Sequence, residues 1–440
     1  MKSRKSSGMQ NNNHRPRVCI NLPLAYPLFN NSFKGYFGGW EVRVSLIARE
    51  LAKRGRFEVV VIVGDYGQPH VECRDEVNLI SWTDRDIWGV PPRRNQNSIL
   101  SWNPFPYGSV PYTIWHRAQK RFFSTLSVYF PGKIFSHIGE FRVPQKNIAI
   151  YDEINADIYI VPGNSFFSAE TASYCSKRGK KYVFLSGSDM DYYPEFKENP
   201  KGRDIYSMPH FLKMYSIQQA DAHIVQTERQ AKMLYDSYDR SCTVIKNPID
   251  INQKFHRTPN PQSILWVGKS DEQVKRPSLV IELARRMPEF QFIVIMNMVH
   301  VKTHMEITRL AGELPNITLI EQVPFEEIER YFADARIHLN TSAFEGFPNT
   351  YLQAAKYSVP TVAMIADPDG MLSYHTCGLV CDNNLDQCEA NLRRLMADDK
   401  IYAELGQKSL EYVRQYHDKD LAAQKYEQAL EAVLANGRLE

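Results

Sequence analysis

The chain has 440 residues, of which 43% are hydrophobic, 23% charged and 12% aromatic, the composition of a soluble globular protein with two or three domains. Its 53 basic and 50 acidic residues nearly balance, so no overall field favours nucleic acid as a partner. The longest uncharged stretch, residues 95–115, is interrupted by prolines and cannot cross a bilayer as an apolar helix.

The cysteines and the N-terminus indicate a reducing compartment. The seven cysteines are scattered and form no CxxC pair, which argues against a zinc cage or a disulfide framework. Residues 1–17 are polar and basic without an apolar segment, so we interpret them as a solvated tail and not as a secretory signal. The alternative is that their basic charges contact an anionic surface. We therefore expect a cytoplasmic protein.

The first half of the chain alternates apolar strands with helices. A strand at Val18–Leu22 leads through a loop to Gly38-Gly39, where a helical pattern begins that ends at Gly55. Phe57–Val63 is almost wholly apolar and β-branched, as in a strand buried on both faces of a parallel sheet. This strand–helix–strand order is a βαβ unit. The same rhythm predicts a helix at Ala169–Arg178 and strands at Ile158–Val161, Tyr182–Leu185, Ala222–Gln226 and Cys242–Ile245.

A second series of strands and helices begins at Ser263, after a break marked by prolines at positions 248, 259 and 261. We expect a helix at Ser278–Met287 and strands at Ile264–Val267, Phe290–Met296, Ile317–Ile320, Ile337–Asn340 and Thr361–Met364. The fold class is therefore α/β, with two doubly wound, Rossmann-like domains. We place their limits at residues 18–250 and 260–417.

Residues 418–440 are expected to form an amphipathic C-terminal helix. An apolar stripe distinguishes one face of that helix and consists of Leu421, Tyr426, Leu430 and Val433. Two interpretations remain open: the helix packs within the second domain, or it crosses back to the first.

A strand, a short loop and a helix within residues 341–360 give the most informative motif. Gly346 and Pro348 lie in the loop, and we expect the helix to start near Asn349, with Asn349 or Thr350 as its cap. The free N–H groups of the first turn would then face the carboxyl edge of the sheet. Ligands bind at that edge in open α/β sheets, and helix N-termini favour phosphate.

Polar and charged residues near this helix start suggest a ligand that carries both phosphate and hydroxyl groups. Glu345 and Gln353 would lie beside the same helix N-terminus, and an acidic residue near an anion site is explained if it holds hydroxyls of a sugar or ribose. A second loop carries Lys269, Lys275 and Arg276 after a strand, and three cations there suit a diphosphate. A solvated basic loop is the alternative interpretation.

Taken together, these motifs resemble the family-4 retaining glycosyltransferases of the GT-B fold. The resemblance extends from about Val18 to the C-terminal helix and is strongest over residues 220–365. It rests on the order and spacing of Gly38-Gly39-Trp40-Glu41, Ala220-Asp221-Ala222, Val244 through Asp250, Val267-Gly268-Lys269 with Lys275, and Ser342 through Pro360.

The resemblance implies a nucleotide-sugar donor in the second domain, an acceptor in the first and catalysis in a cleft between them. Lys269 and Lys275 match the positions that clamp the donor diphosphate, and Glu345 matches the acidic residue that contacts the donor sugar. Gln353 matches the residue that holds the ribose. Gly268 and the phosphate-cradling turn complete the expected donor site, the turn consisting of Gly346, Phe347, Pro348, Asn349 and Thr350.

On the acceptor side, Gly38 and Gly39 match the loop that closes over the reacting centre. Asp189, after a first-domain strand, either orients the acceptor or has a capping or turn role. Cations and helix N–H groups aimed at the departing nucleoside diphosphate would each contribute on the order of a few kcal/mol to catalysis. With two lysines supplying that charge, we expect no metal and no cofactor, the nucleotide-sugar being a substrate.

Four positions depart from the family pattern. Lys269 stands in place of the usual Arg, which loses forked geometry but keeps the charge. Gln353 replaces a Glu, so that a charge-assisted bond to ribose becomes a neutral one. Ser358 replaces a Gly, and no histidine follows Leu185. These changes keep open the alternative of a non-catalytic subunit that binds nucleotide or a partner enzyme.

Residues 93–146 are basic and aromatic, with eight Lys or Arg residues and a single acid, Glu140. Such a segment in the acceptor domain suits peripheral contact with an anionic membrane, where lipid-linked acceptors would lie. The alternatives are an insertion whose aromatic side chains fill the core, and a nucleic-acid contact, which we do not expect.

The function expected from the sequence is sugar transfer, with retention, from a UDP- or GDP-type donor to a glycan or lipid-linked acceptor in polysaccharide or glycoconjugate biosynthesis. Its location would be cytoplasmic or peripheral at the inner face of the membrane. A dinucleotide-dependent oxidoreductase is disfavoured because neither Gly38-Gly39 nor Val267-Gly268 forms a GxGxxG turn.

Overall fold

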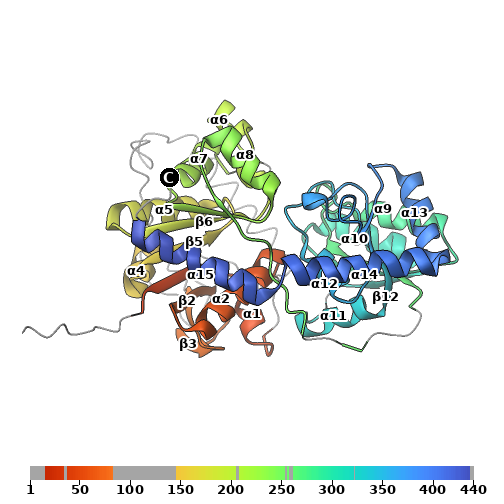
Figure 1. The fold of residues 1–440 in the computed structure, drawn as a ribbon, viewed down its shortest axis with the longest axis horizontal. Helices are drawn as coiled ribbons and strands as arrows, with labels where there is room; N and C mark the ends of the chain where they lie inside the picture. Colours follow the sequence, from red (N-terminus) through yellow and green to blue (C-terminus); the bar gives the residue numbers. More distant parts are fainter. Residues whose placement is uncertain are drawn as a thin grey trace, which may run out of the picture.

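The structure, a computed structural model, describes residues 15–33, 37–82, 145–204, 208–252, 255–256, 261–321 and 323–436. These ranges form two α/β domains, each built on a largely parallel sheet, which confirms the expected fold class (Figure 1). Residues 1–14 and nearly all of the basic segment 93–146 lie outside the described residues. No helix in the described ranges has the length and apolar character needed to cross a membrane.

The first domain contains an eight-stranded sheet in the order β3-β4-β2-β1-β5-β6-β7-β8. Within the described residues β3 is antiparallel to β4, and the other neighbouring pairs are parallel. Strand order reverses beside β1, so the switch point of the sheet lies between β1 and β5. The strands are β1 (Arg17–Asn21), β2 (Glu58–Gly64), β3 (Val71–Arg74), β4 (Val77–Trp82), β5 (Ile158–Pro162), β6 (Lys181–Leu185), β7 (Ala222–Val225) and β8 (Thr243–Val244).

Helices cover both faces of this sheet because its strands are apolar on both sides. In β1, Val18 and Ile20 face one buried cluster whereas Cys19 faces the other, as the period of two requires. The helices are α1 (Tyr26–Phe29), α2 (Gly39–Arg54), α4 (Gln145–Ile154), α5 (Phe166–Arg178), the 3₁₀ helix η1 (Asp189–Tyr192), α6 (Glu195–Glu198), α7 (His210–Gln218) and α8 (Glu228–Tyr238).

The second domain contains a six-stranded parallel sheet in the order β11-β10-β9-β12-β13-β14. Successive residues of β9 again alternate between two clusters, with Ile264 and Trp266 in one and Leu265 in the other. The strands are β9 (Ser263–Lys269), β10 (Gln291–Asn297), β11 (Ile317–Ile320), β12 (Ala335–Asn340), β13 (Thr361–Ala363) and β14 (Gly378–Val380). The helices of this domain are α9 (Pro277–Arg286), α10 (Val301–Gly312), α11 (Phe325–Asp334), α12 (Asn349–Lys356), η2 (Pro368–Gly370), α13 (Leu385–Ala397) and α14 (Asp399–Tyr416), and the chain continues into α15 (Lys419–Asn436).

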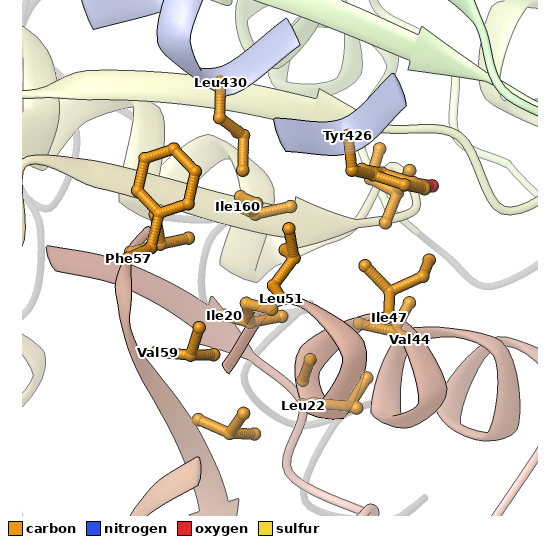
Figure 2. Packing of buried hydrophobic residues seen from close by; sticks show 14 of the residues in the cluster. Ile20, Leu22, Val44, Ile47, Leu51, Phe57, Val59, Ile160, Tyr426 and Leu430 are labelled. Atoms are coloured by element: carbon orange, nitrogen blue, oxygen red, sulfur yellow. The ribbon is translucent and has the colours of Figure 1, made fainter. Parts of the chain in front are cut away.

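The last helix, α15, lies on the first domain although the preceding α14 belongs to the second (Figure 1). Tyr426, Leu430 and Val433 are buried in the core formed with α2 and the first sheet (Figure 2). Leu421 is 39% exposed, so its assignment to the apolar stripe was wrong. A residue five positions before Tyr426 is rotated well away from it, whereas Ala422, at i−4, is buried on the same face.

The chain passes between the domains in two places, and these crossings are bonded to each other. The Ile249 N–H donates to the His417 carbonyl at 2.9 Å, and a bridge joins Ile249 to Asp418. The Nδ1 of buried His417 lies 2.7 Å from the Asn247 carbonyl. Burial lowers the pKa of His417 to about 3, so the ring is neutral and Nδ1–H is the donor.

Candidate active site between the two domains

The site lies at a junction where loops after β9 and β12 meet the start of α2 and the loops after β6 and β7. Asn349, the first residue of α12, donates from Nδ2 to the Gly39 carbonyl at 2.5 Å, across the two domains. The Asn247 amide donates to Asn349 Oδ1 at 3.1 Å and to the Phe347 carbonyl at 3.0 Å. Two of the positions predicted from the sequence, Gly39 and Asn349, are therefore in direct contact.

Gly346 approaches the first domain closely. A Cβ built on this glycine would lie 3.0 Å from Gln230 Nε2, 3.1 Å from Gln226 Oε1 and 3.3 Å from the Gly187 carbonyl. Such distances are shorter than ordinary van der Waals contacts. A side chain at position 346 would therefore force these first-domain neighbours to shift by a few tenths of an ångström.

Lys275 and Glu345 form an ion pair at the carboxyl edge of the second sheet. Their loops follow β9 and β12, which are neighbours in the sheet, and this adjacency brings together residues 70 positions apart. Ser342 Oγ also donates to Glu345 Oε1, at 2.6 Å. Both charged side chains are mostly shielded from solvent, so their interaction is stronger than that of a surface pair.

Lys269, the last residue of β9, faces the start of α2 in the other domain. A Cβ built on Gly38 would lie 3.2 Å from Lys269 Nζ. The Gly38 N–H donates to the Glu41 carboxylate at 2.6 Å. Burial raises the pKa of Glu41, and the positive charge of Lys269 opposes that rise. Lys269 is therefore balanced by a first-domain carboxylate, whereas Lys275 is balanced by one from its own domain.

Arg276 does not join the two lysines. Its guanidinium donates to the Thr341 carbonyl at 2.6 Å and to Asn383 Oδ1 at 2.6 Å. It therefore holds the loop after β12 in place, and the expectation of three cations facing one diphosphate was wrong for this residue. The sequence shows only that three cations follow the same strand. The hydrogen bonds of the folded protein show that Arg276 has a structural role, unlike Lys269 and Lys275.

The start of α12 differs from the expected capped helix. The N-cap is Pro348, with no side-chain hydrogen bond, so neither Asn349 nor Thr350 caps the helix. The Asn349 side chain is used across the domains instead. The backbone N–H groups of Asn349 and Thr350 donate to no described residue, as expected for the first turn of a helix, and remain suited to an anion.

Gln353 is not bonded to the other predicted site residues. It is half-buried on α12, and its side chain has no hydrogen-bond partner among the described residues. Ser358, the other departure beyond this loop, has a φ of +55°, the left-handed conformation in which glycine is most easily accommodated. This backbone conformation explains why a glycine suits that position.

Asp189 is buried in η1 and is connected to the junction through Gln230. Gln230 Nε2 donates to Asp189 Oδ1 at 3.1 Å, and Arg229 lies 3.2 Å from the same carboxylate. Burial raises the pKa of Asp189 to about 6. Ser188, not Asp189, caps η1 by accepting from the Met190 N–H.

Asp191 shapes the loop after β6 and was not predicted from the sequence. Its carboxylate accepts hydrogen bonds from the backbone N–H groups of Gly187 at 2.7 Å, Ser188 at 2.9 Å and Asn164 at 2.9 Å. Gln226, which joins the two domains, was not predicted either. An aspartate shortly after a strand was the available signal for Asp191, but nothing local distinguishes Gln226.

Arg43 connects the C-terminal helix to this loop. It is only 2% exposed, and it donates to the Ser186 carbonyl at 2.8 Å and to the Tyr426 hydroxyl at 3.0 Å. The buried Arg43 guanidinium therefore links the loop after β6 to α15, because it donates to one residue of each.

Among the described residues, no group of three or more His, Cys, Asp or Glu side chains is placed to hold a metal ion. The charged groups that the structure gathers at the junction include the two lysines with their carboxylates. Two ammonium groups, a helix N-terminus and nearby carboxylates can bind a phosphorylated ligand that also carries hydroxyls.

Comparison with known families decides how this second domain is classified. Residues 261–398, which run from before β9 through α13, match the family Glycosyl transferases group 1. This is a glycosyltransferase domain. The match includes Lys269, Lys275 and Glu345, the residues that the geometry gathers at the junction.

A relative in sequence agrees with the classification of this glycosyltransferase domain. The lipopolysaccharide 1,6-galactosyltransferase of Salmonella typhimurium is 25% identical over 223 residues, which cover 47% of this chain and 62% of that protein. The match thus spans less than two thirds of that relative.

Solved structures show the fold. Sucrose-phosphate synthase from Thermosynechococcus elongatus superposes with a TM-score of 0.68 at 14% identity, covering 96% of this chain and all of that one. Anabaena HepE, in complex with UDP, gives 0.59 at 14% identity over 94% and 100% of the two chains. The lipopolysaccharide outer core galactosyltransferase WaaB gives 0.53 at 15% identity over 94% and 99%. The chain therefore has the GT-B fold.

Proposed function

We propose that the protein is a metal-independent, retaining glycosyltransferase that moves a sugar from a UDP- or GDP-type donor to a glycan or lipid-linked acceptor. The observation that carries this proposal is the set formed by Lys275, paired with Glu345 next to the domain-contacting Gly346, by Lys269 at the contact with Gly38, and by the uncapped start of α12. These groups lie in a domain that matches glycosyl transferases group 1 and at its contact with the other domain.

In the proposed reaction the donor diphosphate binds between the two lysines and the first turn of α12. As the bond to the sugar breaks, negative charge grows on the diphosphate oxygens. Lys269, Lys275 and the N–H groups of Asn349 and Thr350 stabilise that charge without reorganising. The exchange that prepares this state accompanies donor binding, when Lys275 leaves its carboxylate partner for phosphate and Glu345 becomes available to accept hydrogen bonds from the donor-sugar hydroxyls.

Closure of the two domains is part of the proposed mechanism. The Asn349–Gly39 bond and the tight approach of Gly346 hold the donor loop against the first domain. Exclusion of water from the reacting centre limits hydrolysis of the donor. The acceptor would enter from the first domain, at the carboxyl edge of its sheet.

The setting of the reaction follows from the relatives. One sequence relative and one structural neighbour are named as lipopolysaccharide galactosyltransferases, which supports a role in glycoconjugate biosynthesis. Because both are named as enzymes, neither of them favours a non-catalytic subunit. We place the protein in the cytoplasm, with residues 93–146 as the contact to an anionic membrane; that segment lies almost wholly outside the described residues.

Nucleotide binding is the first test. Thermal unfolding is measured with UDP and GDP, since a ligand at 100 times its dissociation constant adds about 2.7 kcal/mol to the free energy of unfolding. We expect one of them to raise the midpoint. If neither nucleotide changes it, the proposed donor site is refuted.

Turnover is the second test. A panel of UDP- and GDP-sugars is incubated with glycan acceptors, and release of nucleoside diphosphate is followed with and without EDTA. We expect release that EDTA does not reduce, and NMR of the product should show the anomeric configuration of the donor. Binding of nucleotide without release from any donor would instead indicate a non-catalytic homologue.

A further inference from the structure

A large aromatic side chain is exposed at the junction. Trp40 is the second residue of α2 and follows Gly39, whose carbonyl accepts the hydrogen bond from Asn349 of the other domain. Its side chain is 38% exposed. Tryptophan buries more apolar area than any other residue when it is packed, so an exposed indole beside a proposed active site requires an explanation.

The indole is fixed in position by two glycines. A Cβ built on Gly163 would lie 2.0 Å from a carbon of the six-membered ring of Trp40, and one built on Gly187 would lie 2.7 Å from another. Any larger residue at either position would displace the ring. The backbone of two loops therefore sets the position of the ring, which remains partly exposed.

The place of the indole in the fold is the one where ligands of open α/β sheets bind. Gly163 follows β5 and Gly187 follows β6, and the chain after β1 leads to α2 and Trp40. The indole thus bridges the switch point between β1 and β5 at the carboxyl edge. Crevices outside the carboxyl ends of strands at a switch point are binding sites in such sheets.

We propose that Trp40 is a stacking platform for a pyranose ring of the acceptor. This inference rests on the proposed function, because it takes the second domain as the donor site. Lys269 and Lys275 lie in that domain, which leaves the first-domain indole on the acceptor side.

The chemistry around the indole favours a sugar over a lipid chain. A pyranose presents a face of C–H groups that packs on an aromatic ring, while its hydroxyls remain available to polar neighbours. Ser165 and Ser188, which are both half-buried, follow the two supporting glycines by two residues and by one residue. A single flat ring with polar flanks matches one saccharide unit and offers little to an acyl chain.

The test uses the full chain labelled with 5-fluorotryptophan and saturated with UDP. The ¹⁹F resonance of Trp40 is assigned from the spectrum of Trp40→Phe. Methyl α- and β-pyranosides of glucose, galactose, mannose and N-acetylglucosamine are then titrated in, each alone. We expect at least one glycoside to shift the Trp40 resonance in a saturable manner.

Variants separate stacking from a general structural effect. By saturation-transfer NMR, Trp40→Ala should weaken the binding of that glycoside about tenfold or more, whereas Trp40→Phe, which keeps an aromatic ring, should weaken it less. Tyr235→Ala, which removes another exposed aromatic ring on α8, should leave glycoside binding unchanged. UDP should raise the unfolding midpoint of all three variants as it does that of the parent protein.

The outcomes distinguish this inference from the proposed function. If UDP stabilises the parent protein but no glycoside moves the Trp40 resonance, the platform is refuted and the donor site stands. Glycoside binding by Trp40→Ala with parental affinity refutes the platform as well. If neither UDP nor GDP stabilises the parent protein, the proposed function has failed, and glycoside binding at Trp40 would then show a saccharide site independent of it.

Discussion

The backbone N–H of Phe347, in the second domain, donates a hydrogen bond to the Gln226 side chain of the first domain at 3.0 Å. Gln226 in turn donates to the Ser186 carbonyl at 2.8 Å. One amide thus connects the loop that we propose to bind phosphate with the loop that supports Trp40. Its amide oxygen accepts one of these hydrogen bonds and its amide nitrogen donates the other.

Replacing this amide tests how strongly the two domains are coupled. Gln226→Leu leaves the buried Phe347 N–H without its partner, and an unpaired buried group costs about 1–3 kcal/mol, whereas the Ser186 carbonyl keeps its hydrogen bond from Arg43. We expect a lower urea midpoint and a larger share of donor lost to hydrolysis. Gln218→Leu, on the exposed face of α7, is the control. Equal midpoints for the two variants would contradict the role given to Gln226.

Lys275 should be required for donor binding. Lys275→Ala removes a charged contact worth on the order of 1.5–3 kcal/mol, so UDP or GDP affinity and turnover should each fall at least about tenfold. Calorimetric titration measures the affinity. Lys400→Ala, which removes an exposed lysine on α14, is the matched control. A folded Lys275→Ala protein with parental kinetics would refute the assignment of this lysine.

Gln353 offers a gain-of-function test. If its amide lies near the ribose, Gln353→Glu replaces a neutral hydrogen bond with a charge-assisted one, which is about twice as strong. We expect tighter binding of UDP by calorimetry. A 2′,3′-dideoxy analogue of UDP lacks the hydroxyls and should show no gain. A gain that is equal for both nucleotides, or no gain for UDP, would place Gln353 away from the ribose.

Asp189 should make stability depend on pH. Its pKa is raised by burial from 3.8 to about 6 in the folded protein, so the folded state holds the proton more tightly than the unfolded state. Ionisation therefore costs stability above about pH 6, and this cost disappears as the pH falls below the unfolded value. Asp189→Asn removes the cost and should raise the free energy of unfolding by on the order of 2 kcal/mol near pH 8, relative to its effect near pH 4.

Urea unfolding of parent and variant across this range measures the difference. The Asp189→Asn side chain keeps an oxygen that can accept from Gln230, so the local hydrogen bond survives the substitution. Parallel stability curves for the two proteins would show that Asp189 ionises normally in the folded state.

Much of the fold could be predicted because its signals are local. The apolar run of β2 and the helix of α2, which ends at Gly55, follow directly from side-chain patterns. The edge strand β3 was missed because its residues are mostly exposed and carry no apolar pattern. The three-residue β14 is too short to give one.

The site could be predicted only in part. The Lys275–Glu345 pair depends on β9 and β12 being neighbours, an order that the sequence alone does not reveal; the resemblance only assigned both residues to the donor site. Contacts made by Gln226 and Trp40 depend on how loops of separate strands or domains meet. Local sequence patterns hold no information about such tertiary contacts. For that reason no functional role was predicted for Gln226 or Trp40.

The bonded pair of chain crossings at Ile249 and His417 restricts how the domains can move. Because the two crossings are bonded to each other, we expect any domain rotation to have its hinge near this place. Asn247, beside this hinge, also contacts the Phe347 carbonyl. A ligand that displaces the loop before α12 would act close to this hinge. A small displacement there would therefore produce larger displacements at the ends of both domains that lie farthest from the hinge.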